Sequence, residues 1–267
     1  MTEVITDIED SRIAVYHALL ENQLKHIYEP EEGLFIAESP VVIERALDAG
    51  YVPESFLVTE EECTDEKARR IFMPYEEKLP VYRAKLEVLR KIPGWNLTRG
   101  LLCAMKRKPL AEAVKVLENA RRVCVMEKVM NPTNAGSIFR NAAALGIDAV
   151  LLTPGCADPL YRRAARVSMG TVFMIPWTYI ESALSVKEYG FKTVSMALRN
   201  DSAEISDERL KKEEKLAILM GSEETGLLPE TIEKSDYVVK IPMNNGVDSL
   251  NVASASAVAF WELAKKL

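Results

Sequence analysis

Residues 121–145 read RRVCVMEKVMNPTNAGSIFRNAAAL, which is a short apolar run, a polar turn and a helical stretch in that order. The run Val123–Glu127 is typical of a buried strand. A helix is predicted over Ala135–Leu145, with Asn134 as its N-cap and Gly146 ending it. A strand that leads through a polar turn into a helix is one β-α unit.

The same alternation continues towards the C-terminus. Further strands are predicted over Ala149–Thr153, Val172–Pro176, Thr193–Ala197, Leu216–Met220 and Val238–Ile241. Further helices are predicted over Pro159–Val167, Glu181–Tyr189, Glu208–Lys212 and Asn251–Lys265. Short apolar strands that alternate with helices imply an α/β fold with a mostly parallel sheet covered on both faces.

The first part of the chain mixes helical and strand patterns. Ser39-Pro40 opens a predicted helix over Val41–Ala49, and strands are predicted over Ser55–Thr59 and Gly100–Met105. A charged connector follows. We therefore expect a smaller α/β domain over residues 1–108, a linker over 109–119 and a larger domain over 120–267.

Composition excludes several classes of protein. The chain has 267 residues, of which 48% are hydrophobic and 28% charged, so it is neither disordered nor collagen-like. No apolar run approaches the ~20 residues that span a bilayer. The acidic N-terminus is no signal peptide, so we expect a cytoplasmic protein with reduced thiols. Four scattered cysteines and two histidines argue against a metal site.

Charge is distributed unevenly along the chain. The net charge of −6 combines −9 over residues 1–98, +8 over 99–199 and −5 over 200–267. Clustered cations of this kind can meet a phosphate backbone, although a solvated face explains them as well. The candidates for nucleic-acid contact are Arg99, Lys106, Arg107, Arg162, Arg163 and Arg166.

Three polar clusters follow three of the predicted strands. They are NPTNAGSIFRN (131–141), LMGSEETGL (219–227) and IPMNNGVDSLN (241–251), and the last precedes a helix rich in Ala and Ser. Ligands of an open parallel sheet bind beyond the carboxyl ends of the strands, so these are candidate ligand loops. The second cluster is neither a dinucleotide motif nor a P-loop. Taken singly, each cluster is also explained as a helix cap, a turn or a surface loop.

Together the three clusters resemble the motifs of the SpoU/TrmH class of SPOUT RNA methyltransferases in their order, spacing and local sequence. Arg166–Phe173 is similar to the R-x-S-x-G segment of that family. Residues 35–39 (FIAES) resemble, more loosely, the ribosomal-protein-like substrate-binding domain that is often fused before it. That domain usually has Gly where Ser39 stands.

The resemblance implies a homodimeric enzyme that transfers a methyl group from S-adenosylmethionine to a ribose 2′-hydroxyl of rRNA or tRNA. It also implies a deep trefoil knot near the C-terminus, which would form the cofactor pocket. Carried over residue by residue, the pocket comprises Gly221, Ile241, Met243, Leu250 and Asn251. The catalytic set comprises Asn134, Arg140, Glu223, Ser249 and Asn251.

A ribose hydroxyl is a weak nucleophile, so the expected chemistry is alignment together with stabilisation of the developing alkoxide. Guanidinium groups keep their proton, so Arg140 is expected to stabilise the alkoxide rather than act as a base. Two other readings remain open. One is a catalytically silent RNA-binding or ribosome-associated protein, and the other is an α/β enzyme for a nucleotide-containing small molecule.

Overall fold

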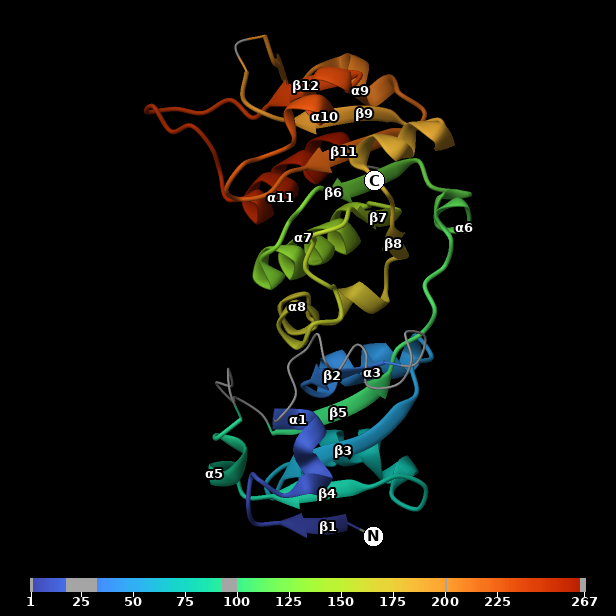
Figure 1. The fold of residues 1–267 in the computed structure, drawn as a ribbon, viewed down its shortest axis with the longest axis vertical. Helices are drawn as coiled ribbons and strands as arrows, with labels where there is room; N and C mark the ends of the chain where they lie inside the picture. Colours follow the sequence, from blue (N-terminus) through green and yellow to red (C-terminus); the bar gives the residue numbers. More distant parts are fainter. Residues whose placement is uncertain (1, 18–32, 93–99, 200, 265–267) are drawn as a thin grey trace. The chain divides into compact units, whose positions relative to one another are not determined.

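A computed structural model describes residues 2–17, 33–92, 100–199 and 201–264 (Figure 1). The chain forms two compact units. Unit 1 comprises Met1–Pro109 and Leu160–Phe173, and unit 2 comprises Leu110–Pro159 and Met174–Leu267. Within the described ranges, no helix is both long and apolar enough to cross a membrane.

Unit 1 is built on a five-stranded mixed sheet with the strand order β1-β4-β3-β5-β2. β5 is antiparallel to β2 and β3, whereas β4 is parallel to β1 and β3. The strands are β1 (Thr2–Ile5), β2 (Leu34–Glu38), β3 (Pro53–Thr59), β4 (Val81–Ala84) and β5 (Leu101–Lys106). The helices are η1 (Ser11–Ile13), α1 (Ala14–His17), α3 (Pro40–Asp48), α4 (Glu66–Phe72), η2 (Met73–Tyr75), α5 (Leu86–Leu89), α8 (Arg162–Val167) and η3 (Thr171–Phe173).

The residue between β2 and α3 has an unusual backbone conformation. Ser39 has φ 87° and ψ 149°, and its side chain makes no capping hydrogen bond. This region of φ and ψ is adopted almost only by glycine. Ser39 therefore holds a glycine-like turn under strain.

Replacement of Ser39 by glycine is therefore expected to stabilise the protein. Glycine relieves the backbone strain, but it also raises the conformational entropy of the unfolded chain. The net gain in the free energy of unfolding is about 1 kcal/mol. Urea unfolding of Ser39→Gly measures it, with Ser39→Ala as the control because alanine keeps the strain. A Ser39→Gly protein that is less stable than the parent would show that the conformation is not strained.

Unit 2 is built on a seven-stranded sheet in which all strand pairs are parallel, as the alternating pattern predicts. The strand order is β10-β12-β9-β11-β6-β7-β8. The strands are β6 (Arg122–Met126), β7 (Ala149–Leu152), β8 (Trp177–Tyr179), β9 (Lys192–Met196), β10 (Ala203–Glu204), β11 (Leu216–Met220) and β12 (Tyr237–Lys240). The helices are α6 (Ala113–Leu117), α7 (Pro132–Leu145), η4 (Ala183–Tyr189), α9 (Glu208–Lys212), α10 (Pro229–Lys234) and α11 (Val252–Leu263).

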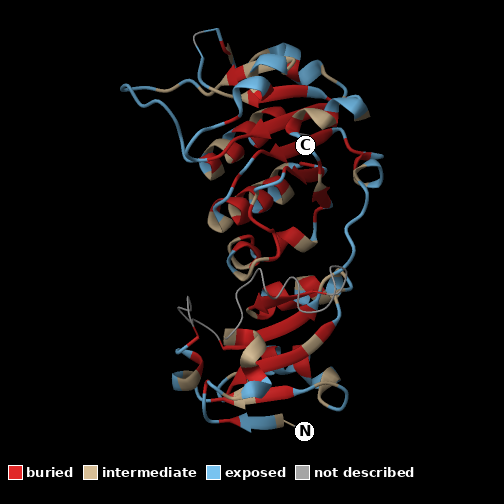
Figure 2. Cartoon of the chain, viewed as in Figure 1, coloured by how far each residue is buried: buried red, intermediate tan, exposed pale blue. Residues whose placement is uncertain are grey.

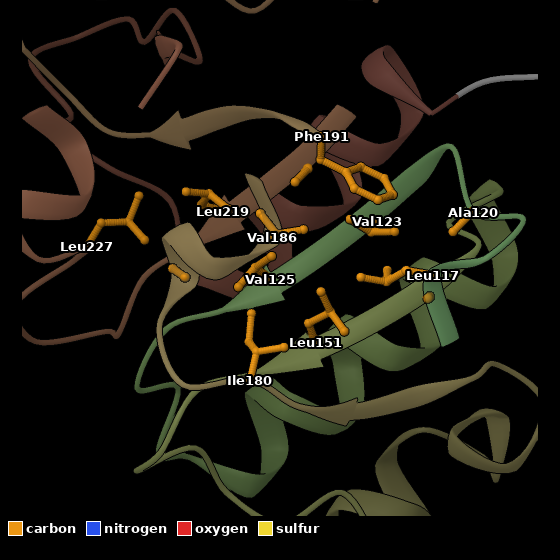
Figure 3. Packing of buried hydrophobic residues seen from close by; sticks show 13 residues of the cluster. Leu117, Ala120, Val123, Val125, Leu151, Ile180, Val186, Phe191, Leu219 and Leu227 are labelled. Carbon is orange, nitrogen blue, oxygen red and sulfur yellow. The ribbon is translucent and has the colours of Figure 1, made fainter. Parts of the chain in front are cut away.

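Side chains of the central strands alternate between two buried layers. Val123 and Val125 of β6 pack with Val186 of η4 and Leu117 of α6 in one cluster (Figure 3). The neighbouring Cys124, which points to the opposite face, is also fully buried. Burial on both faces explains why these strands are continuous apolar runs (Figure 2).

Three local predictions were wrong. The run Val172–Pro176 is not a strand: η3 occupies its start, and β8 begins only after Pro176. Val172 and Ile175 are buried although they lie in and after a turn, in which the hydroxyl of Thr171 donates to the carbonyl of Ser168 at 2.9 Å. The helix predicted over Glu181–Tyr189 is the 3-10 helix η4, which begins at Ala183.

The third correction concerns the start of α7. The N-cap is Asn131, whose side-chain oxygen accepts a hydrogen bond from the amide of Thr133 at 2.8 Å. Pro132 takes the first helical position, which needs no amide hydrogen. Asn134 therefore lies inside the first turn with its side chain free for other contacts. The predicted end of the helix at Gly146 is confirmed, with φ 84°.

A buried arginine forms hydrogen bonds with the end of the C-terminal helix. Arg122 donates to the carbonyl of Leu263 at the end of α11 and to the carbonyls of Glu213 and Glu214 after α9. Burial lowers the pKa of this guanidinium. Five backbone carbonyls in all accept hydrogen bonds from it, so α11 is held firmly against the start of β6.

Candidate functional site

A pocket of about 580 Å³ lies beyond the carboxyl ends of β9, β11 and β12, where the rule for open parallel sheets places ligands. It is lined by residues 196–198 after β9, 220–227 after β11 and 239–241 at the end of β12. The lining is completed by Ile232, Met243, residues 248–252 and Ala255.

The β11 loop folds back on itself. Ser222 and Gly226 exchange two backbone hydrogen bonds of 3.1 Å, and the hydroxyls of Ser222 and Thr225 are 2.9 Å apart. A Cβ atom on Gly221 would lie 2.2 Å from the carbonyl carbon of Gly226. Glycine is therefore the residue that fits at 221, because two backbone segments meet there.

A buried carboxylate anchors the far end of this loop. Glu127, at the end of β6, is 3% exposed. It accepts hydrogen bonds of 2.7 Å from the amide of Leu228 and from the hydroxyl of Thr231. Glu127 was not among the predicted site residues. An acidic residue directly after an apolar strand was the available signal, because a carboxylate that is buried there needs hydrogen-bond partners from a neighbouring segment.

A chain of polar side chains connects the three sequence clusters. The amide nitrogen of Asn134 donates to a carboxylate oxygen of Glu223. The oxygen of the same amide accepts from the side-chain nitrogen of Asn251 at 3.3 Å. Asn251 is the N-cap of α11 and accepts from the amide of Ala253 at 2.9 Å. Three of the five predicted catalytic residues thus form one network at the pocket.

All five predicted cofactor residues, and three of the five predicted catalytic residues, lie in the pocket lining, with Asn251 in both sets: Gly221, Ile241, Met243, Leu250, Asn251, Glu223 and Ser249. The pocket is also lined by three residues that were not among the predicted site residues, Met196, Ala197 and Leu198. They lie at the carboxyl end of β9 and directly after it, so the rule that ligands bind at carboxyl strand ends was the signal that could have found them.

Arg140 lies apart from this network. It is exposed on α7 and is not among the residues that line the pocket. Among the described residues its side chain has no hydrogen-bond or ion-pair partner. Its guanidinium is therefore available to a bound anion, but the chain alone does not bring it into the pocket.

The predicted cations of α8 are arranged within unit 1. Arg166 forms an ion pair with the buried Glu38 of β2 at 2.8 Å, and the guanidinium of Arg162 lies 3.9 Å from the same carboxylate. Arg163 is exposed. Of the three, Arg163 is the cation that does not face Glu38.

The predicted cations near the end of β5 contact nearby groups of unit 1. The guanidinium of Arg107 donates to the carbonyl of Leu34 at 3.2 Å, and Lys106 lies 3.5 Å from the carboxylate of Glu54. The two side chains of the Lys106–Glu54 pair are about half exposed, so the pair is weak. Arg99 lies outside the described residues.

Comparison with known proteins gives a consistent result. Residues 121–261 match the SpoU rRNA Methylase family. An uncharacterized tRNA/rRNA methyltransferase of Mycobacterium bovis is 36% identical over 265 residues, which cover 97% of this chain and 90% of that protein. The 23S rRNA (guanosine(2553)-2′-O)-methyltransferase of Bacillus subtilis is 27% identical over 237 residues, with 86% and 88% covered.

The fold is also shared with a solved structure. The SpoU methyltransferase AviRb from Streptomyces viridochromogenes, crystallised in complex with AdoMet, superposes with a TM-score of 0.78 at 20% identity. The match covers 96% of this chain and 98% of that one. A family match over more than half of the chain, with a relative that spans nearly all of it, establishes the relationship: the chain belongs to the SpoU rRNA methylase family.

Proposed function

We propose that this SpoU-family enzyme transfers a methyl group from S-adenosylmethionine to a ribose 2′-hydroxyl of rRNA or tRNA. The observation that carries the proposal is the pocket at the carboxyl ends of β9, β11 and β12, together with the Glu223–Asn134–Asn251 network beside it. The relatives named as tRNA/rRNA and 2′-O-methyltransferases support it.

The residues present fit the cofactor. The volume of about 580 Å³ lies within the range of pockets that hold small molecules. Leu198, Ile241 and Met243 would give an apolar surface for a planar base, and the carboxylate of Glu223 would favour a cationic sulfonium. When bound, S-adenosylmethionine supplies a methyl group that its positive sulfur already activates.

The residues of this chain then have distinct roles. Asn134 and Asn251 hold the carboxylate of Glu223 in one orientation, and Ser249 holds the ribose or the methionine end of the cofactor. Arg140 stabilises the developing alkoxide, and a neighbouring RNA phosphate can take the proton. Since Arg140 is outside the pocket lining, bound RNA or a second subunit must bring the ribose and this guanidinium together.

Domain roles follow from the same resemblance. Residues 1–108 form the substrate-binding domain, 109–119 the linker and 120–267 the methyltransferase domain. The cations of the first domain and of α8 bind RNA phosphates, with Arg163 as the most accessible one on that helix. A knotted C-terminal segment and a cytoplasmic location are part of the proposal.

The homodimer that the resemblance implies has a suitable surface on α11. Ser254, Val258 and Trp261 are exposed and recur at i, i+4 and i+7, so they form one stripe along the helix. Val258 is 38% and Trp261 53% exposed. Large exposed apolar side chains that line up on one helix mark an association surface.

Trp261→Arg is therefore expected to convert the dimer into a monomer, because a charge would be buried without a partner. Light scattering coupled to size-exclusion chromatography measures the mass. The control is Val52→Arg, since Val52 is equally exposed but lies in unit 1. A parent protein with the mass of one chain would refute the dimer.

Mapping of 2′-O-methyl sites across rRNA and tRNA, in cells with and without this gene, tests the function. The proposal predicts at least one ribose that is methylated only when the gene is present, and that regains the mark with purified protein and S-adenosylmethionine. RNA binding without such a site would favour the catalytically silent protein. Cofactor binding without RNA methylation would favour the small-molecule enzyme.

A further inference from the structure

Asn141 makes the contacts that join α7 to α11. Its side-chain nitrogen donates to the carbonyl of Ala253 at 2.8 Å and to the hydroxyl of Ser256 at 2.9 Å. Ser256 is fully buried, and its hydroxyl also donates to the carbonyl of Ala253, at 2.7 Å. Both hydrogens of the Asn141 amide are thus used on the first turn of α11.

The same turn of α11 is also held from its other side. The amide of Ala253 donates to the side-chain oxygen of Asn251, and the side-chain nitrogen of Asn251 donates to the side-chain oxygen of Asn134. Asn134 and Asn141 are seven residues apart, which is two helical turns, so both lie on the face of α7 towards α11. One face of α7 therefore carries two asparagines, and they hold the two ends of a single turn of α11.

The packing between these helices makes the hydrogen bonds important. The side chains of α11 near the contact are small, namely Ala253, Ser256 and Ala257. Small side chains at this end allow a close approach but interlock little, whereas Phe260 and Leu263, which are buried further along the same face, pack by shape. At the start of α11, the two hydrogen bonds from Asn141 therefore fix the register.

We propose that Asn141 is a positioning residue for methyl transfer. It sets the first turn of α11 so that Asn251 meets Asn134 and Glu223, although Asn141 itself is not among the pocket-lining residues. The inference rests on the proposed function. Loss of the register moves Asn251 within the network, whereas most of the pocket is formed by the carboxyl ends of β9, β11 and β12 and the segments directly after them, and stays in place.

The test compares Asn141→Ala with the parent protein in methyl transfer to undermodified RNA, well below the melting temperature of each protein. We expect kcat to fall about 10- to 100-fold, as misplacement by about 1 Å does elsewhere. The KM for S-adenosylmethionine should rise by a smaller factor than kcat falls, because only the part of the pocket at the start of α11 is displaced. Asn119→Ala, at an exposed asparagine, is the matched control. Val186→Ala destabilises the core away from α7 and α11 and should leave kcat unchanged.

A double-mutant cycle separates positioning from general destabilisation. If Asn141 acts through Asn251, then Asn141→Ala adds little further loss to Asn251→Ala. The inference is overturned if the losses in kcat multiply, if Asn141→Ala keeps the parent kcat, or if Val186→Ala lowers kcat as much. A parent protein that methylates no RNA would instead refute the proposed function and leave the cycle without a rate to compare.

Discussion

Arg140→Lys is expected to lose about 100- to 1,000-fold in kcat for RNA methylation, the range seen when one donor to a developing oxyanion is removed. Lysine keeps the positive charge but not the planar fork of donors that can bridge an alkoxide and a phosphate. Binding of S-adenosylhomocysteine should not change, because Arg140 is outside the pocket lining. Single-turnover methyl transfer and calorimetric titration measure the two quantities.

The control for this variant is Arg209→Lys, at an exposed arginine that pairs with Asp207 on α9. It should keep the parent kcat. A fully active Arg140→Lys enzyme would remove Arg140 from the chemistry. Weakened binding of S-adenosylhomocysteine would instead mean that Arg140 helps to build the pocket, contrary to the geometry described above.

Gly221→Ala is expected to weaken cofactor binding strongly. The added Cβ would lie 2.2 Å from the carbonyl carbon of Gly226 and 2.3 Å from the amide nitrogen of Leu227. Backbone atoms cannot move aside as a flexible side chain does, so the β11 loop must open. Overpacking of about 1–3 kcal/mol corresponds to a loss of roughly 10- to 100-fold in affinity. Calorimetric titration with S-adenosylhomocysteine measures this loss.

Gly190→Ala is the matched control for this variant. Gly190 has a positive φ of 82°, and an added Cβ would have no atom within 4 Å. The control therefore carries backbone strain without a clash, and it should lose some stability but keep the parent affinity. Equal affinities for Gly221→Ala and the parent would show that the cofactor binds elsewhere.

The fold was predictable where local pattern and tertiary burial agree. β11 is the clearest case, since the run Leu216–Met220 is apolar and is buried on both faces. The strand predicted over Val172–Pro176 was wrong, because apolar side chains can be buried by a 3-10 turn as well as by a sheet. Over five residues, hydrophobic periodicity cannot distinguish the two. The placement of 160–173 with unit 1 depends on contacts with residues more than a hundred positions away, such as Glu38 with Arg166.

Most residues of the site could be predicted from the sequence, but their arrangement could be predicted less well. The polar clusters at strand ends gave the pocket lining, because the topology of a parallel sheet brings carboxyl ends together. Asn134 was predicted as a cap, but Asn131 takes that role and leaves Asn134 to contact Glu223. The catalytic set implied by the resemblance included Arg140, but the sequence could not show which way its side chain faces.

The central claim is that S-adenosylmethionine binds between the β11 loop and the start of α11. A crystal structure of the protein with S-adenosylhomocysteine tests it most directly. We expect the ligand in the pocket, in contact with Gly221, Ile241 and Asn251, with the Glu223–Asn134–Asn251 network intact. A ligand bound at another place, or a pocket that stays empty at saturating concentration, would contradict the claim.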